Sequence, residues 1–401
     1  MDIDVLNALR SPVGLPGPAG VFLILLVLTW SLHILAVQIM LGMITLSLFG
    51  TFQKGSHWRR LSLHALECGK VAVSIAIVLG VAPLLFVQVI YDPFWYVSNV
   101  LSGRWVIASI FILLLGYYAL YHGHFIKKGG EARQGWISIA VALSLLTSFG
   151  WIMHALTSQM LTPEHWQQWY APNGHIDPRG ASLHATNLGR FGYFLALSAP
   201  VTAAWLSGYA RFLETRENAE SSAAYVNWLS RLYPPLFTTG VFLALVCYSV
   251  WMSTLPEAAK DFPKTGWAWL AIFGTLVVGI RPTSAPSYRP LMLALVANLC
   301  IAIAREALRL KIFGDHYGYE LSSYPVHLDG YGIFLFIATL FGVGVPAIGY
   351  LVGTAWAFGQ GAAKARTESH TLQRLGTLSL YGLAAWVIQY FIAGLYTLVR
   401  G

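Results

Sequence analysis

Ionisable side chains lie within several segments of this chain that are otherwise almost entirely apolar. One such segment contains His33, and another contains Arg305 and Glu306 next to each other. Charged and imidazole groups are costly inside a membrane and are retained there mainly where they serve a function. With a rise of about 1.5 Å per residue along a helix, these groups are predicted to converge near one surface of the membrane. The full set is His33, His154, His184, Arg190, Arg305, Glu306 and Arg309.

These residue types are suited to a bound haem b. Neutral imidazoles on facing helices are common axial ligands of haem iron, and arginine pairs with haem propionates through two parallel hydrogen bonds. The Glu306 carboxylate, with Arg309 three residues later, suits an iron ligand, a proton carrier or a plain ion pair. For any single histidine, a hydrogen-bonded packing role is an equal alternative. The 3 cysteines are scattered and no CxxCH motif is present, so a haem here is expected to be held by coordination rather than by thioether bonds.

The composition indicates that the helices that carry these residues lie in a membrane. Of the 401 residues, 10% are charged and 56% are hydrophobic, whereas soluble domains carry about 25% charged residues. A soluble enzyme and a disordered chain are therefore excluded. We expect an all-α, polytopic integral membrane bundle that forms one transmembrane domain over 1–401. About ten spans are predicted, of which the seventh is short: 20–49, 67–90, 104–123, 136–161, 184–210, 229–253, 267–281, 290–312, 330–358 and 377–399.

The basic residues predict the orientation of these spans. Loops on one side carry twice as many Lys and Arg residues as the loops and termini on the other. The positive-inside rule therefore places both termini outside the cytoplasmic membrane of a bacterium or archaeon. It places the ionisable residues named above in the outer half of the bilayer. Asp2 and Asp4 stand where a signal peptide carries positive charge, so the first span is expected to be retained. The net charge of +8 then lies on the inner face and does not indicate a nucleic-acid partner.

Several of these segments resemble subunit I of the cytochrome bd quinol oxidases. His33–Met43 is similar to the family's first-helix segment, and His184–Tyr193 is similar to its fifth-helix segment. Ala304–Ala307 is similar to the family's Ile-Glu-Ala segment, and shorter similarities occur at Leu79–Val81 and Trp151–Pro163. The resemblance implies a bd-like core over 1–358 and an extra span at 377–399. It also implies three ligands of haem iron: His33, His184 and Glu306.

The chain departs from that family at three places. The family's third helix carries two glutamates at the oxygen-reducing centre, whereas Arg104–Tyr118 contains no acid and has Ala108 and Gly116 at about those positions. The family's second ligand of the low-spin haem is a Met, and 267–281 contains none, so His154 is a candidate partner for His184. The family's long quinol-binding loop is reduced to about Ser253–Gly266.

These departures favour electron transfer over oxygen reduction, because oxygen reduction needs titratable groups that deliver protons to a buried site. We expect a haem b subunit, with one to three haems, of a membrane quinol or quinone oxidoreductase complex. It would exchange electrons with an extracytoplasmic redox protein such as a c-type cytochrome and assemble with other membrane subunits. A bd-type terminal oxidase and a haem-free transporter or assembly scaffold stay open as alternatives. Catalytic residues are not assigned, and the candidates for binding quinone near the outer surface are Tyr317, Tyr319 and His327.

Overall fold

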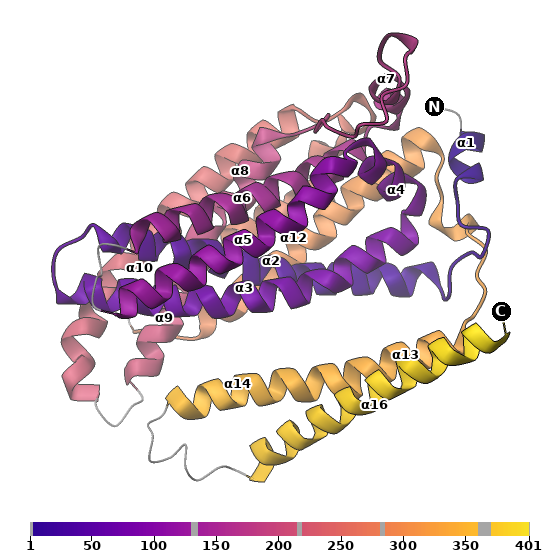
Figure 1. Ribbon diagram of the computed structural model, residues 1–401. Helices are drawn as coiled ribbons and strands as arrows, with labels where there is room; N and C mark the ends of the chain where they lie inside the picture. Colours follow the sequence, from indigo (N-terminus) through magenta and orange to yellow (C-terminus); the bar gives the residue numbers. More distant parts are fainter. Residues whose placement is uncertain (1–2, 130–134, 215–218, 281–284, 360–369, 401) are drawn as a thin grey trace. The chain divides into compact units, whose positions relative to one another are not determined.

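A computed structural model of the chain describes residues 3–129, 135–214, 219–280, 285–359 and 370–400 (Figure 1). Over these ranges the chain is mostly helical and forms no strand, apart from one isolated β-bridge between Leu15 and Val326. The all-helical fold predicted from the sequence is therefore confirmed. The helices of the first 214 residues are α1 (Ile3–Ala8), α2 (Ala19–Thr51), α3 (Ser56–Ile90), α4 (Asp92–Leu101), α5 (Gly103–Lys128), α6 (Trp136–Gln159), α7 (Trp166–Tyr170), α8 (Leu188–Ala196) and α9 (Ser198–Glu214).

Further helices follow in the second half of the chain. They are α10 (Ala219–Ser253), α11 (Gly266–Val278), α12 (Arg289–Lys311), α13 (Gly330–Thr339), α14 (Val345–Gly359) and α16 (His370–Arg400). A π-helical turn, η5 (Ile312–His316), continues α12, and another, η7 (Leu340–Gly344), joins α13 to α14. Each predicted span overlaps one of these helices or helix pairs.

Eight segments of the described residues are long and apolar enough to cross a membrane. They are α2, α3, α5, α6, most of α10, α12 with η5, α13 with most of α14, and most of α16. The seventh predicted span corresponds to α11, which has 13 residues. At about 1.5 Å per residue it is about 20 Å long, shorter than the roughly 30 Å hydrocarbon core. The exact number of spans and the side on which the termini lie stay predictions.

The fifth predicted span differs from the structure at its beginning. It was expected over 184–210, but α8 begins at Leu188, and His184 lies in an extended segment before it. Helix α8 then ends at Ala196, and α9 begins at Ser198. Pro200 lies in the first turn of α9, where its missing N–H costs least, so proline is tolerated at the start of the second helix.

By its contacts the chain divides into two compact units. The first contains residues 1–12 and 19–324, and the second contains 13–18 and 325–401. The division at Tyr324 precedes the end of the bd-like core that the resemblance implies at 358.

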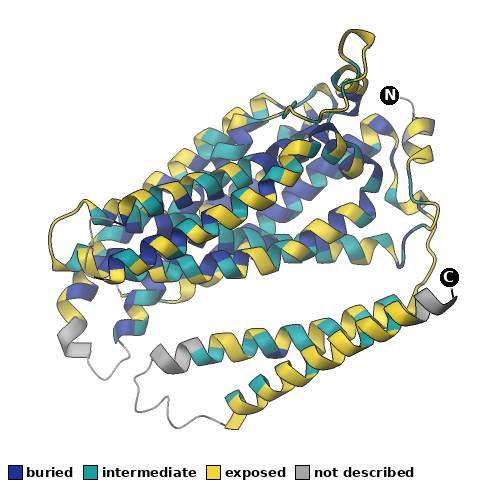
Figure 2. Cartoon of the chain, in the orientation of Figure 1, coloured by how far each residue is buried: buried dark blue, intermediate teal, exposed yellow. Residues whose placement is uncertain are grey.

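In the first unit, α2, α9 and α12 pack against one another, and their buried residues are dark blue in Figure 2. Helix α12 is the most deeply buried of the candidate spans. A helix shielded from lipid is where charged side chains are least costly in a membrane, and α12 carries Arg305, Glu306 and Arg309. Close packing of α8 on α10 depends on Gly189, because a Cβ atom there would lie 2.5 Å from the backbone nitrogen of Trp251.

The second unit is an antiparallel pair in which α16 packs along α14 and η7. The order of its contacts shows the direction, since Gly353 faces Leu372 whereas Gly342 faces Gly382. A Cβ atom at Gly382 would lie 2.5 Å from the carbonyl oxygen of Gly342, so the two backbones meet there. Most of the described side chains of this unit are exposed (Figure 2), as expected for helices that face lipid or a partner.

Candidate functional site

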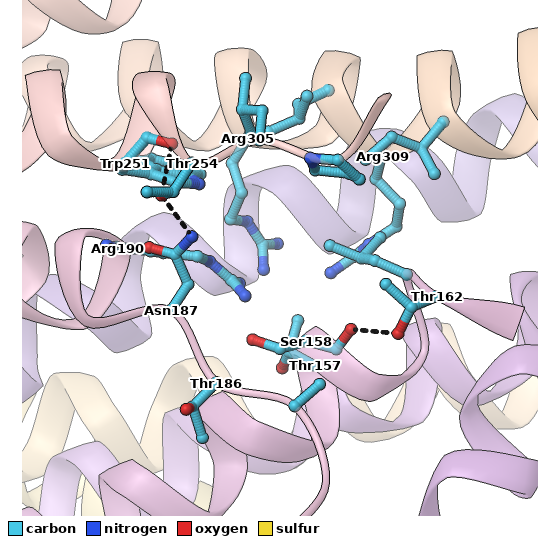
Figure 3. A pocket seen from close by; sticks show the side chains of 16 residues that line it. Thr157, Ser158, Thr162, Thr186, Asn187, Arg190, Trp251, Thr254, Arg305 and Arg309 are labelled. Atoms are coloured by element: carbon cyan, nitrogen blue, oxygen red, sulfur yellow. Dashed lines mark hydrogen bonds between the residues drawn. The ribbon is translucent and has the colours of Figure 1, made fainter. Parts of the chain in front are cut away.

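Three arginines from two helices point into one cavity of the first unit (Figure 3). Arg190 comes from α8, and Arg305 and Arg309 come from successive turns of α12. The cavity has a volume of about 190 Å³ and is also lined by hydroxyl and amide side chains of α6, the segment before α8, and the end of α10. All three guanidinium-bearing side chains are buried. We call this cavity the arginine pocket.

One carboxylate, that of Glu306, accompanies these arginines. Arg309 Nη1 donates to both oxygens of Glu306, at 3.1 Å to Oε1 and 2.9 Å to Oε2. Arg305 Nη2 donates to Oε2 at 3.4 Å, and the hydroxyl of Tyr91 donates to Oε1 at 2.7 Å. Helix α12 therefore provides both an anion and its two cations, and the residue that follows α3 provides a further donor.

The charges of the arginine pocket do not balance. Three guanidinium groups against one carboxylate leave a net charge of +2 among the described residues of this cluster. Arg190 Nη1 and Arg305 Nε are buried and have no hydrogen-bond partner among the described residues. Buried positive charge of this kind is costly unless it meets an anion. A negatively charged group in the pocket would offset this cost.

His33 lies next to this cluster on α2. Its Nδ1 is 2.9 Å from the carbonyl oxygen of Ala76 on α3, so Nδ1 carries the proton and donates it to that oxygen. Nε2 then keeps its lone pair and makes no hydrogen bond to a described residue. A histidine that donates from one ring nitrogen to a carbonyl and leaves the other free has the orientation of a metal ligand.

Gly80 leaves room for the His33 ring, and Trp30, on the same helix as His33, contacts the arginine pocket. At Gly80 a Cβ atom would lie 2.8 Å from His33 Cε1. The ring centroid of Trp30, one turn earlier on α2, lies 4.0 Å from the guanidinium carbon of Arg305. This cation–π contact connects the face of α2 that carries His33 with the arginine pocket.

His154 has a different role in the structure. Its Nε2 accepts the backbone N–H of Asn187 at 3.0 Å, and its ring packs against Trp151 and Phe191. Asn187 is the N-cap of α8, where its side-chain oxygen accepts the backbone N–H of Arg190 at 2.8 Å. His154 therefore supports the start of the helix that carries Arg190, and in this arrangement its acceptor nitrogen is not available to iron.

His184 lines a second, smaller cavity of about 120 Å³. Its ring stacks on Trp169 with the centroids 5.0 Å apart, and its backbone N–H donates to Oε1 of Gln159 at 2.7 Å. Burial lowers the pKa of the His184 imidazole, which favours the neutral form that a metal needs. The three residues that follow it, 185–187, line the arginine pocket. His184 is thus close to that pocket along the chain without lining it.

The candidate quinone residues are already hydrogen-bonded. The hydroxyl of Tyr317 donates to Glu164, and the hydroxyl of Tyr319 donates to the carbonyl oxygen of Ile90 at 3.2 Å. Burial raises the pKa of the Tyr317 hydroxyl above its ordinary value. His327 is exposed and belongs to the second unit, where its backbone N–H donates to Leu15. No cavity described here is lined by these three residues.

Sequence reasoning missed the residues that hold the charged groups in place. Tyr91, Asn187 and Gln159 are ordinary polar residues at the ends of helices, and no local pattern indicates their partners. The hydrogen bond from Tyr91 to Glu306 joins residues 215 positions apart. Among the residues that the structure describes, no three His, Cys, Asp or Glu side chains form a group able to hold a metal ion. Comparisons of the chain with protein-family models, curated proteins and solved structures find no match.

Proposed function

We propose that this chain is a membrane haem b subunit that moves electrons between quinol or quinone and an extracytoplasmic redox partner, such as a c-type cytochrome. The observation that carries the proposal is the arginine pocket, with two buried guanidinium nitrogens that have no partner among the described residues. The two propionates of a haem are carboxylates that would neutralise the excess charge and accept from those donors. The resemblance to subunit I of the cytochrome bd oxidases supports the same assignment.

The residues present fit such a group in their chemistry. His33 offers Nε2 to iron, and Arg190, Arg305 and Arg309 offer donors to the propionates. At about 190 Å³ the arginine pocket is smaller than the roughly 300–1,000 Å³ that encloses a whole small ligand, so it suits the carboxylate end of a larger group. When bound, haem supplies one-electron transfer. The chain's own residues would orient the group and balance its charge.

The proposal includes a location and an assembly. The chain would lie in the cytoplasmic membrane of a bacterium or archaeon with both termini outside, and work with other membrane subunits. Oxygen reduction is the less favoured activity, because α5 contains no Asp or Glu to supply protons at the place where bd oxidases have two. A haem-free transporter of organic anions would also use buried arginines, so the presence of haem decides between the two.

The test is a pyridine haemochrome assay on the purified protein. The wild type is expected to contain b-type haem, and the double variant Arg190→Gln/Arg305→Gln is expected to contain several-fold less per chain. Arg211→Gln is the matched control, because Arg211 is an exposed arginine of α9 whose ion-pair partner among the described residues is Glu214. His33→Ala should change the reduced-minus-oxidised spectrum. A wild-type protein without haem would refute the proposal, and a chlorin-type band with oxygen uptake would favour the oxidase.

A further inference from the structure

The carboxylate of Glu306 has no free acceptor position. A carboxylate offers about four lone-pair sites, and Glu306 receives four hydrogen bonds. These are one from Tyr91, one from Arg305 and two from Arg309. A ligand of iron must present an unoccupied lone pair, as Nε2 of His33 does. Glu306 therefore differs from His33 in the property that coordination requires.

The hydroxyl of Tyr91 occupies the last of the four acceptor positions of the Glu306 carboxylate. Tyr91 follows the final residue of α3 and is completely buried, and its ring packs edge-on against Phe313 with the centroids 5.2 Å apart. The guanidinium carbon of Arg309 lies 5.2 Å from the centroid of the Tyr91 ring. Packing on both sides holds the ring, and a hydrogen bond to an ionised acceptor is about twice as strong as one between neutral groups.

We propose that Tyr91 is a positioning residue that holds Glu306 as the internal counter-anion of the arginine pocket, and that Glu306 is not a ligand of iron. With this anion fixed, the pocket keeps a charge of +2 and takes a dianionic group. The two propionates of one haem are such a group. The identification of the dianionic group as haem rests on the proposed function, whereas the pairing of Tyr91 with Glu306 does not.

A double-mutant cycle tests the pairing with or without haem. Thermal unfolding in detergent is measured for Tyr91→Phe, Glu306→Gln and the double variant. The two Tm losses are expected to be non-additive, so that the double variant loses less than their sum. Tyr193→Phe is the matched control, because Tyr193 is also completely buried and shares one hydrogen bond, with Thr275. Its loss should add to that of Glu306→Gln, and additivity of Tyr91→Phe with Glu306→Gln would overturn the pairing.

Spectra and midpoint potentials test the role at the haem. Glu306→Gln is expected to keep the type of iron spectrum and to shift the midpoint potential to more positive values, since one negative charge is lost nearby. Tyr91→Phe is expected to keep the spectrum as well. A change in the type of iron spectrum in Glu306→Gln, with Tyr91→Phe unaffected, would show that Glu306 ligates iron. Should Glu306→Gln fail to accumulate, Tyr91→Phe must still lower Tm more than Tyr193→Phe, and an equal loss would overturn the proposal. A haem-free wild type would refute the proposed function alone, because the cycle still decides the pairing.

Discussion

Arg190 and Arg309 line the same pocket, but only the replacement of Arg309 by methionine should destabilise the ligand-free protein. Arg309 forms a two-point ion pair with Glu306, whereas Arg190 forms no ion pair with a described residue and has only a cation–π contact with Trp251, at 5.9 Å. Removing one partner of a buried ion pair costs about 3–5 kcal/mol. Removing a buried charge without a partner relieves a desolvation cost, so Arg190→Met should leave Tm unchanged or raise it.

The expected magnitudes can be worked out from these contacts. At about 2–4 °C per kcal/mol for a chain of this order of size, Arg309→Met should lower Tm by on the order of 10 °C. For the ligand, Arg190 would supply up to two hydrogen bonds to a carboxylate, each of about 1.5–3 kcal/mol because the groups are charged. Their loss of about 3–6 kcal/mol corresponds to a roughly 10²- to 10⁴-fold weaker affinity.

The assay compares thermal unfolding of the ligand-free protein with haem binding after reconstitution. Methionine is a good helix former and leaves the backbone contact of residue 190 with the Asn187 cap intact, so the start of α8 should not be disturbed. Arg190→Met is expected to be stable and poor in haem. If it lost as much stability as Arg309→Met and still bound haem like the wild type, the assignment of Arg190 as an unpaired cation awaiting an anion would be wrong.

Three further predictions concern the surroundings of the site. Gly80→Ala should displace the His33 ring and alter the haem spectrum, because the new Cβ would lie 2.8 Å from His33 Cε1, whereas Gly20→Ala, with no atom near the new Cβ, should not. Asn187→Ala should lower stability by about 1 kcal/mol, seen as a lower Tm in detergent, because the N-cap of α8 is lost, and an unchanged Tm would contradict that role. Burial raises the pKa of the Asp92 carboxyl above 3.8, so the folded state binds protons more tightly there than the unfolded state. The stability that Asp92 contributes relative to Asp92→Asn should therefore fall as pH rises above 3.8. The measurement is the Tm of the wild type minus the Tm of Asp92→Asn at a series of pH values. If this difference increased with pH, the hydrogen bonds to Asp92 would outweigh its burial.

Local sequence was sufficient to predict most of the helices. The first span was predicted over 20–49 and α2 runs over Ala19–Thr51, because a long apolar run in a membrane must satisfy its backbone hydrogen bonds internally. The start of α8 was placed too early, since 184–187 belong to an extended segment whose backbone is held by side chains of α6. Those side chains, Gln159 and His154, are remote from it in the sequence, so hydropathy could not indicate the boundary.

The sequence by itself determined that the chain is helical, that its long helices are apolar enough for a membrane, and which side chains are too costly there to be incidental. Composition and periodicity carry that information because each residue contributes to it independently of its partners. Only the tertiary structure decided which of these side chains are satisfied and which are not. It pairs Glu306 with Arg305, Arg309 and Tyr91 and engages His154 with a helix cap. It leaves His33 and Arg190 each with a side-chain nitrogen that has no partner among the described residues. Hydrogen bonds and ion pairs join specific atoms over a few ångströms, so they depend on which helices meet, and no local pattern contains that information.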